Sequence, residues 1–167
     1  MKLLRRCLVM LALMFWQGGF MFYGGVVVPV GSEVLGSDTD QGWITRKVTD
    51  YLNVAGAVAL TLWGWDIAVA RDPAPWRKRL RGLVWVFLAA ALGVLVWVHG
   101  RMDSLLDPEA LRILDRPHFR SLHRWYLGTS TLQWAGSLLL LFWTLQAWQS
   151  EDARGETPAG TFPAGGA

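Results

Sequence analysis

The sequence predicts an all-α fold, a four-helix transmembrane bundle, and three observations support this prediction. Hydrophobic residues form 53% of the 167-residue chain and charged residues only 17%, a composition typical of membrane proteins. Four segments are apolar over close to the roughly 20 residues that cross a bilayer. Basic residues gather between these segments. We expect helices at about residues 7–30, 51–70, 83–98 and 117–148, within a transmembrane domain of residues 1–150, followed by a disordered tail of residues 151–167.

The first predicted helix begins like a secretory signal peptide, with "MKLLRRCLVMLALMFW". The apolar run continues through "GGFMFYGGVVVPV" without a small-x-small cleavage site, so we expect a retained transmembrane helix. Two glycine pairs, Gly18–Gly19 and Gly24–Gly25, favour a face that packs closely on another helix. Gln17 lies near the middle of the helix and is expected on the same face. The single cysteine, Cys7, excludes an internal disulfide.

The second predicted helix carries a polar row and an ionisable residue. Asp50, Asn53 and Thr61 lie at helical steps of three and four, which predicts a shared face. Asp50 also suits the start of a helix, where its side chain would cap the backbone. Asp66 lies inside the span, and an ionisable group there is a functional candidate. Two interpretations stay open: an ion pair with Arg71 or another base of the following loop, or a role in handling protons or substrate.

The third predicted helix is the shortest, and its Trp85 and Trp97 are placed to lie at the two membrane interfaces. After it, Asp107 followed by Pro108 suits the start of a short helix outside the membrane. Pro117 similarly suits the start of the fourth helix.

The fourth predicted helix carries the most regular polar pattern in the chain. Alternating steps of three and four residues keep five polar side chains on one helix face: His123, Tyr126, Ser130, Gln133 and Ser137. Hydrogen bonds between such residues hold membrane helices together. The stripe is therefore interpreted either as helix adhesion or as a working surface inside the bundle.

The distribution of basic residues predicts the orientation. Lys2, Arg5 and Arg6 lie at the N-terminus, and residues 71–81 hold five more Lys and Arg. Because short cytoplasmic loops are enriched in Lys and Arg, both termini are expected in the cytoplasm, in a multi-pass protein of the cell inner membrane. The net charge of +3 is spread along membrane edges, so no nucleic-acid partner is expected. The expected partners are the lipid bilayer and either another membrane protein or further copies of the chain.

The histidines fall on the predicted outer side, where they suggest a site. His99 ends the third helix and His123 begins the fourth, so we expect them near Tyr126 and Asp50. These four residues are the candidate catalytic residues. The spacing of the histidines is not that of a metal site, and no phosphate-binding or hydrolase motif is present. We therefore predict neither a metal nor another cofactor.

Two segments resemble a known kind of membrane domain. "FWQGGFMFYGGVVVPVG" resembles the opening helix of small four-helix membrane domains of unknown function, of the transmembrane-protein-205-like kind. Phe119 and His123 in "FRSLHRWYLGTSTLQW" match the Phe-x-x-x-His entry to the last helix of that kind. The same segments are similar to anthrone-oxygenase-like four-helix proteins, which would imply cofactor-independent oxidation of an aromatic substrate. The likeness covers about a third of the chain and brings no catalytic residue with it.

These observations favour a non-enzymatic function. The preferred hypothesis is a small transporter-like or assembly component with a polar face inside the bundle. That face would consist of Gln17, Asn53, Thr61, Asp66, Ser130, Gln133 and Ser137. The alternative is a membrane-embedded, oxygenase-like enzyme with its site at the outer ends of the second, third and fourth helices. There His123 would act as general base and Tyr126 would donate a hydrogen bond.

Overall fold

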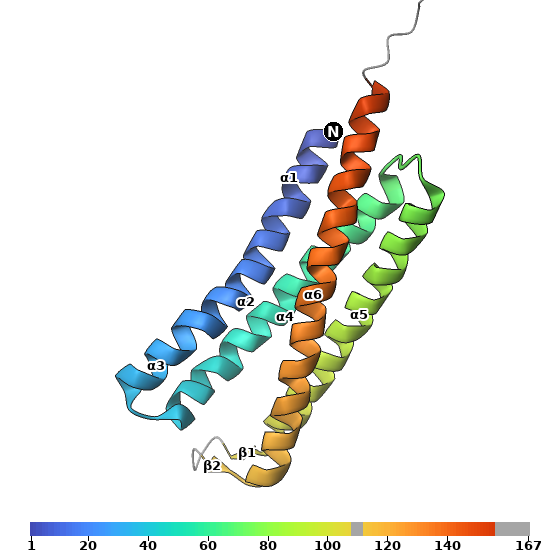
Figure 1. The fold of residues 1–167 in the computed structure, drawn as a ribbon. Helices are drawn as coiled ribbons and strands as arrows, with labels where there is room; N and C mark the ends of the chain where they lie inside the picture. The colour runs from blue at the N-terminus through green and yellow to red at the C-terminus, as the bar shows by residue number, and fades with distance from the viewer. Residues whose placement is uncertain (108–111, 156–167) are drawn as a thin grey trace, which may run out of the picture.

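The computed structural model describes residues 1–107 and 112–155, and within them the fold is built from four long helices (Figure 1). The first runs over α1 (Lys2–Leu13), η1 (Met14–Gly18), α2 (Gly19–Phe22), η2 (Tyr23–Val27) and α3 (Val28–Leu35). The others are α4 (Asp38–Val69), α5 (Pro75–Asp103) and α6 (Arg116–Gly155). The all-α prediction is confirmed. Among the described residues, three helices are long and apolar enough to cross a membrane, namely the first helix, α4 and α5.

Every helix extends beyond its apolar stretch. The largest difference is in α4, which begins at Asp38 instead of about residue 51. Gly36, at φ 62°, makes the turn before it, and the Ser37 hydroxyl accepts a hydrogen bond from the Asp40 N–H at 3.2 Å. Asp50 therefore lies within the helix, and the prediction that it starts one is wrong. The apolar pattern marks where a helix meets lipid, whereas its ends are set by caps and turns.

The predicted tail is partly helical. Residues 151–155 continue α6, because Glu151 and Asp152 pair with arginines of the first helix. The rest of the predicted disordered tail, residues 156–167, lies outside the described residues.

The segment before α6 also differs from the prediction. Two-residue strands, β1 (Leu106–Asp107) and β2 (Arg112–Ile113), pair antiparallel on either side of the segment where the short helix is expected to start. Pro108 lies outside the described residues. We call the end of the molecule that carries these strands the hairpin end, and the opposite end, where α1 begins and α6 ends, the terminal end (Figure 1).

The first helix contains two wider π-type turns, η1 and η2, which include glycines of both pairs. Such turns often occur at functional sites, because they rotate the side chains that follow them. Both turns contribute side chains to the cavity described below.

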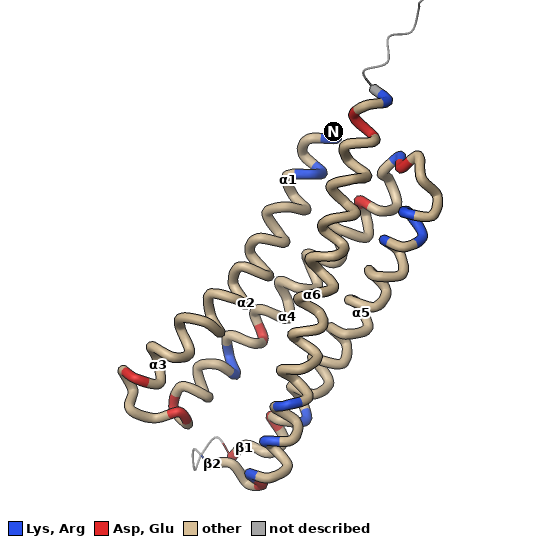
Figure 2. The backbone as a smooth tube through the Cα atoms, viewed as in Figure 1, with Lys and Arg blue, Asp and Glu red and all other residues tan. Residues whose placement is uncertain are grey.

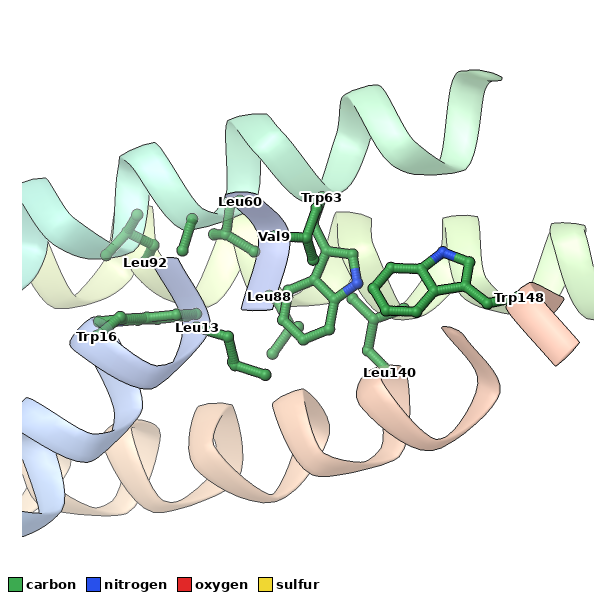
Figure 3. Packing of buried hydrophobic residues seen from close by; sticks show 10 residues of the cluster. Val9, Leu13, Trp16, Leu60, Trp63, Leu88, Leu92, Leu140 and Trp148 are labelled. Atoms are coloured by element: carbon green, nitrogen blue, oxygen red, sulfur yellow. The ribbon is translucent and has the colours of Figure 1, made fainter. Parts of the chain in front are cut away.

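The apolar core draws on all four helices and lies toward the terminal end. Trp63 of α4, Leu88 of α5 and Leu140 of α6 are fully buried, and Val9 of α1 packs with them (Figure 3). Many large apolar side chains, by contrast, point outward along all four helices. Figure 2 shows most charged residues toward the two ends, with a largely uncharged stretch between them. This distribution suits helices that meet lipid around their middle.

Candidate functional site

A cavity of about 560 Å³ lies between the four helices toward the hairpin end. Its size suits a small-molecule ligand. The first helix packs against α4, and α6 packs against α5. The first helix and α6 diverge toward the hairpin end (Figure 1). Residues of both helices line the cavity. A hydrogen bond of 3.3 Å from Trp134 Nε1 to Met21 Sδ links the two helices there.

Three of the four candidate catalytic residues line this cavity, namely His99, His123 and Tyr126. The fourth, Asp50, reaches it through His99, because Asp50 Oδ1 lies 3.0 Å from His99 Nε2. An ionised carboxylate only accepts hydrogen bonds, so His99 Nε2 carries the hydrogen. The rings of His99 and Tyr126 lie 6.4 Å apart. Helices α4, α5 and α6 thus bring these candidates together, as the positions of the histidines at helix ends suggested.

His123 packs against an aromatic ring of its own helix. Its ring stacks on Phe119, one turn earlier in α6, with centroids 6.4 Å apart and 7° between the planes. The His123 side chain is exposed on one side, and the partial burial of the rest lowers its pKa, which favours the neutral imidazole. Among the described residues, no group of three or more His, Cys, Asp or Glu side chains is placed to hold a metal ion.

Four residues of the predicted polar face line the cavity, namely Gln17, Asn53, Ser130 and Gln133. Gln133 Nε2 donates to the Leu88 carbonyl at 3.2 Å and so ties α6 to α5. Ser130 is 5% exposed, and its hydroxyl lies beside the Tyr126 hydroxyl, one turn earlier in α6, without a hydrogen bond of good geometry to any described residue. Gln17, 9% exposed, likewise makes none within the described chain.

The other three residues of the predicted polar face lie elsewhere. Ser137 is fully buried nearer the terminal end and donates to the Trp134 carbonyl at 2.7 Å. Thr61 is exposed and donates to the Ala57 carbonyl of its own helix, so it does not face the interior. Asp66 belongs to a separate cluster at the terminal end.

Asp66 is the centre of a buried ionic cluster that joins all four helices. It is fully buried and lies 2.8 Å from Arg5 Nε of α1 and 2.6 Å from Arg81 Nη2 of α5. Trp148 Nε1 of α6 donates to Asp66 Oδ1 at 3.0 Å. The base that pairs with Asp66 from the region of the following loop is Arg81, whereas Arg71 is exposed. Sequence reasoning missed Arg5 and Trp148, because long-range pairing leaves no local signal.

The cluster extends to the end of α6. Glu151 Oε2 lies 2.8 Å from Arg5 Nη2 and 3.1 Å from Arg6 Nη2. Arg6 also pairs with Asp152 at 2.7 Å and lies over the Trp148 ring, 5.3 Å from its centroid. The three arginines, Arg5, Arg6 and Arg81, thereby face three carboxylates, Asp66, Glu151 and Asp152, so formal charge is balanced. The cluster thus ties the ends of α1 and α6 to α4 and α5 without a net formal charge.

We expect this cluster to weaken in acid. Burial alone would raise the pKa of Glu151, but Arg6 and Arg5 outweigh it and lower that pKa; Arg6 also lowers the pKa of Asp152. A depressed pKa stabilises the fold above the ordinary carboxyl value of about 4 and loses this effect as pH falls through the folded pKa. The unfolding temperature should therefore fall between about pH 5 and about pH 3, and Arg6→Gln should flatten that dependence. Arg101→Gln, at the hairpin end, should leave it unchanged; an equal slope in both variants would contradict the assignment.

No protein-family model, curated protein or solved structure matches this chain. The resemblance of the first and last helices to four-helix membrane domains therefore remains a prediction.

Proposed function

We propose that the chain is a transporter-like or binding component of the cell inner membrane that takes up a small, largely apolar molecule from the outer side. The observation that carries this proposal is the cavity at the hairpin end, which all four helices line. The buried ionic cluster closes the terminal end. A molecule would therefore enter and leave through the hairpin end or between the diverging first helix and α6.

The proposal includes α6 as a fourth membrane span over about residues 125–148. The polar residues of this stretch lower its hydropathy, but several of them, Ser130, Gln133, Ser137 and Thr144, are buried against the other helices. Large apolar side chains, Leu132, Leu138, Leu139 and Phe142, cover the exposed side. Lipid would meet the apolar side, which is what a spanning helix requires.

The proposed orientation puts the terminal end in the cytoplasm. Lys2, Arg5 and Arg6 lie at this end, together with the basic loop between α4 and α5. An excess of Lys and Arg on one side supports a cytoplasmic placement of that side. The cavity then opens toward the outside of the cell.

Cysteine labelling tests both the orientation and the cavity. Single cysteines are placed in a Cys7→Ser background: Thr45→Cys, which lines the cavity, Lys78→Cys at the terminal end, and Val54→Cys on the exposed apolar side. A membrane-impermeant thiol reagent added to intact spheroplasts should modify only the first. Lys78→Cys should react after the membrane is opened, and Val54→Cys should stay unreactive in lipid. Labelling of Lys78→Cys alone in intact spheroplasts would reverse the orientation, and no labelling of Thr45→Cys would contradict an open cavity.

One observation favours an enzyme as the second candidate. The contact of 3.0 Å between His99 and Asp50 is the arrangement by which a carboxylate orients an imidazole for proton transfer, and the ring of Tyr126 lies near it. His99, His123 and Tyr126 would then act on the molecule held in the cavity. Release of a chemically changed molecule would favour the enzyme, whereas unchanged release would favour binding or transport.

A further inference from the structure

Buried polar side chains without partners in the cavity indicate which hydrogen-bonding groups a bound molecule would carry. Buried amides and hydroxyls nearly always have hydrogen-bond partners. The Gln17 side chain is about nine-tenths buried, lines the cavity and has no such partner in the described chain. Ser130, which lines the same cavity, has only the Tyr126 hydroxyl beside it, without a hydrogen bond of good geometry. Asn53, half-buried in the same cavity, is also without one among those residues. Gln17 therefore needs a partner that the described residues do not supply, and Asn53 and Ser130 have hydrogen-bonding capacity left over beside it.

The charged groups of the lining exclude an ionic occupant. Arg46 Nε pairs with Asp103 Oδ1 at 2.8 Å. His99 Nε2 lies 3.0 Å from Asp50 Oδ1. Asp38 is exposed in the first turn of α4. These groups belong to the hairpin-end parts of their helices, so none of them is an unpaired counter-ion beside Gln17. A charged ligand group at the depth of Gln17 would lose its hydration without a compensating charge, which is costly.

The remaining lining is apolar and aromatic. Trp16 and Phe20 of the first helix face the same cavity as Leu95 of α5 and Leu127 of α6. Such walls favour a hydrophobic body, and uncharged amides and hydroxyls both donate and accept hydrogen bonds. The cavity thus combines an apolar surface with a neutral polar patch.

We propose that the cavity binds an uncharged, mainly apolar molecule through one hydroxyl or carbonyl group, which hydrogen-bonds to Gln17, Asn53 and Ser130. This inference rests on the proposed function and adds the class of ligand. Alcohols, phenols and ketones of membrane-soluble size share this chemistry.

The test uses photoreactive probes that differ in one group. Aryl trifluoromethyl diazirines with a para hydroxymethyl, methyl, carboxylate or trimethylammoniomethyl group are added to the full-length protein in lipid nanodiscs. Labelled peptides are then located by mass spectrometry over a range of probe concentrations. The hydroxymethyl probe should label cavity peptides saturably, and the methyl probe about tenfold more weakly, since one hydrogen bond to a neutral group corresponds to about a factor of ten.

Matched variants identify the groups responsible. Gln17→Leu and, separately, Asn53→Leu should each weaken labelling by the hydroxymethyl probe by about threefold, a part of the difference between the two probes, while leaving labelling by the methyl probe unchanged. Thr61→Val, which removes an exposed hydroxyl outside the cavity, should alter neither. Asn53 is half-buried, so its variant keeps the test decisive if the Gln17 variant does not fold.

The outcomes separate the two proposals. Saturable cavity labelling that is strongest for the carboxylate or trimethylammonium probe would overturn the ligand class but leave the binding function intact. Equal saturable labelling by the methyl and hydroxymethyl probes would also overturn the ligand class and leave the binding function intact. Labelling by every probe that rises without saturation would indicate lipid-like partitioning and would overturn the binding function as well.

Discussion

Asp66→Asn should lower the free energy of unfolding by about 3–5 kcal/mol, the usual cost of removing one member of a buried ion pair. The substitution keeps the shape of the side chain but leaves Arg5 and Arg81 without the carboxylate between them. Two nitrogens of Arg81, Nε and Nη1, already lack hydrogen-bond partners in the described chain, so this arginine depends on Asp66. Reversible unfolding in lipid bicelles measures the loss.

Two further variants isolate the cause. Asp103→Asn makes the same change in a half-exposed pair with Arg46 and should cost only about 0–1 kcal/mol. Asp66→Asn combined with Arg81→Gln should be more stable than Asp66→Asn alone, because Arg5 keeps Glu151 while the unpaired charge of Arg81 is gone. A loss for Asp66→Asn no larger than that for Asp103→Asn would show that the cluster does not hold the helices together.

The sequence predicted that four helices exist because each contains an apolar stretch, but it did not predict where the helices begin and end. It also identified Asp66 as unusual, since a carboxylate inside an apolar run needs a partner wherever the chain folds. Its partners Arg5 and Trp148 lie 61 and 82 positions away, at opposite ends of the chain. No local sequence pattern indicates contacts between residues so far apart in the chain.

Helical geometry explains why the deeper part of the polar row in α6 faces the interior, whereas the row in α4 does not. In α6 the alternating steps of three and four keep Ser130, Gln133 and Ser137 on one face, and all three are buried. In α4 the step from Asn53 to Thr61 is two successive fours, which rotates the side chain by about 80° at 3.6 residues per turn. Asn53 consequently lines the cavity, whereas Thr61 is exposed.

The cavity itself was beyond prediction from the sequence. Four residues identified from the pattern line it, but its walls come from all four helices, and the first helix and α6 diverge toward the hairpin end. That divergence depends on tertiary packing, including the close approach of Trp16 to α4, and not on any single helix.

This close approach occurs at Gly56, and filling it should destabilise the protein. A Cβ atom at Gly56 would lie 2.8 Å from Trp16 Nε1 and 2.9 Å from Trp16 Cε2, closer than side chains tolerate. Trp16 is 4% exposed, so its ring has little room to move. Gly56→Ala should therefore lower the free energy of unfolding by about 1–3 kcal/mol, the range typical of overpacking.

The matched control should change stability in the opposite direction. A Cβ atom at Gly128, in α6, would have no neighbouring atom within 4 Å, and alanine favours helix over glycine. Gly128→Ala should therefore raise the free energy of unfolding by about 0.5–1 kcal/mol. Adding Trp16→Phe to Gly56→Ala should cost less than the sum of the two single changes, because the smaller ring relieves the contact. Because Trp16 also lines the cavity, Gly56→Ala should weaken labelling by the hydroxymethyl probe. A higher free energy of unfolding for Gly56→Ala would contradict the prediction and would show that the first helix can move away from α4.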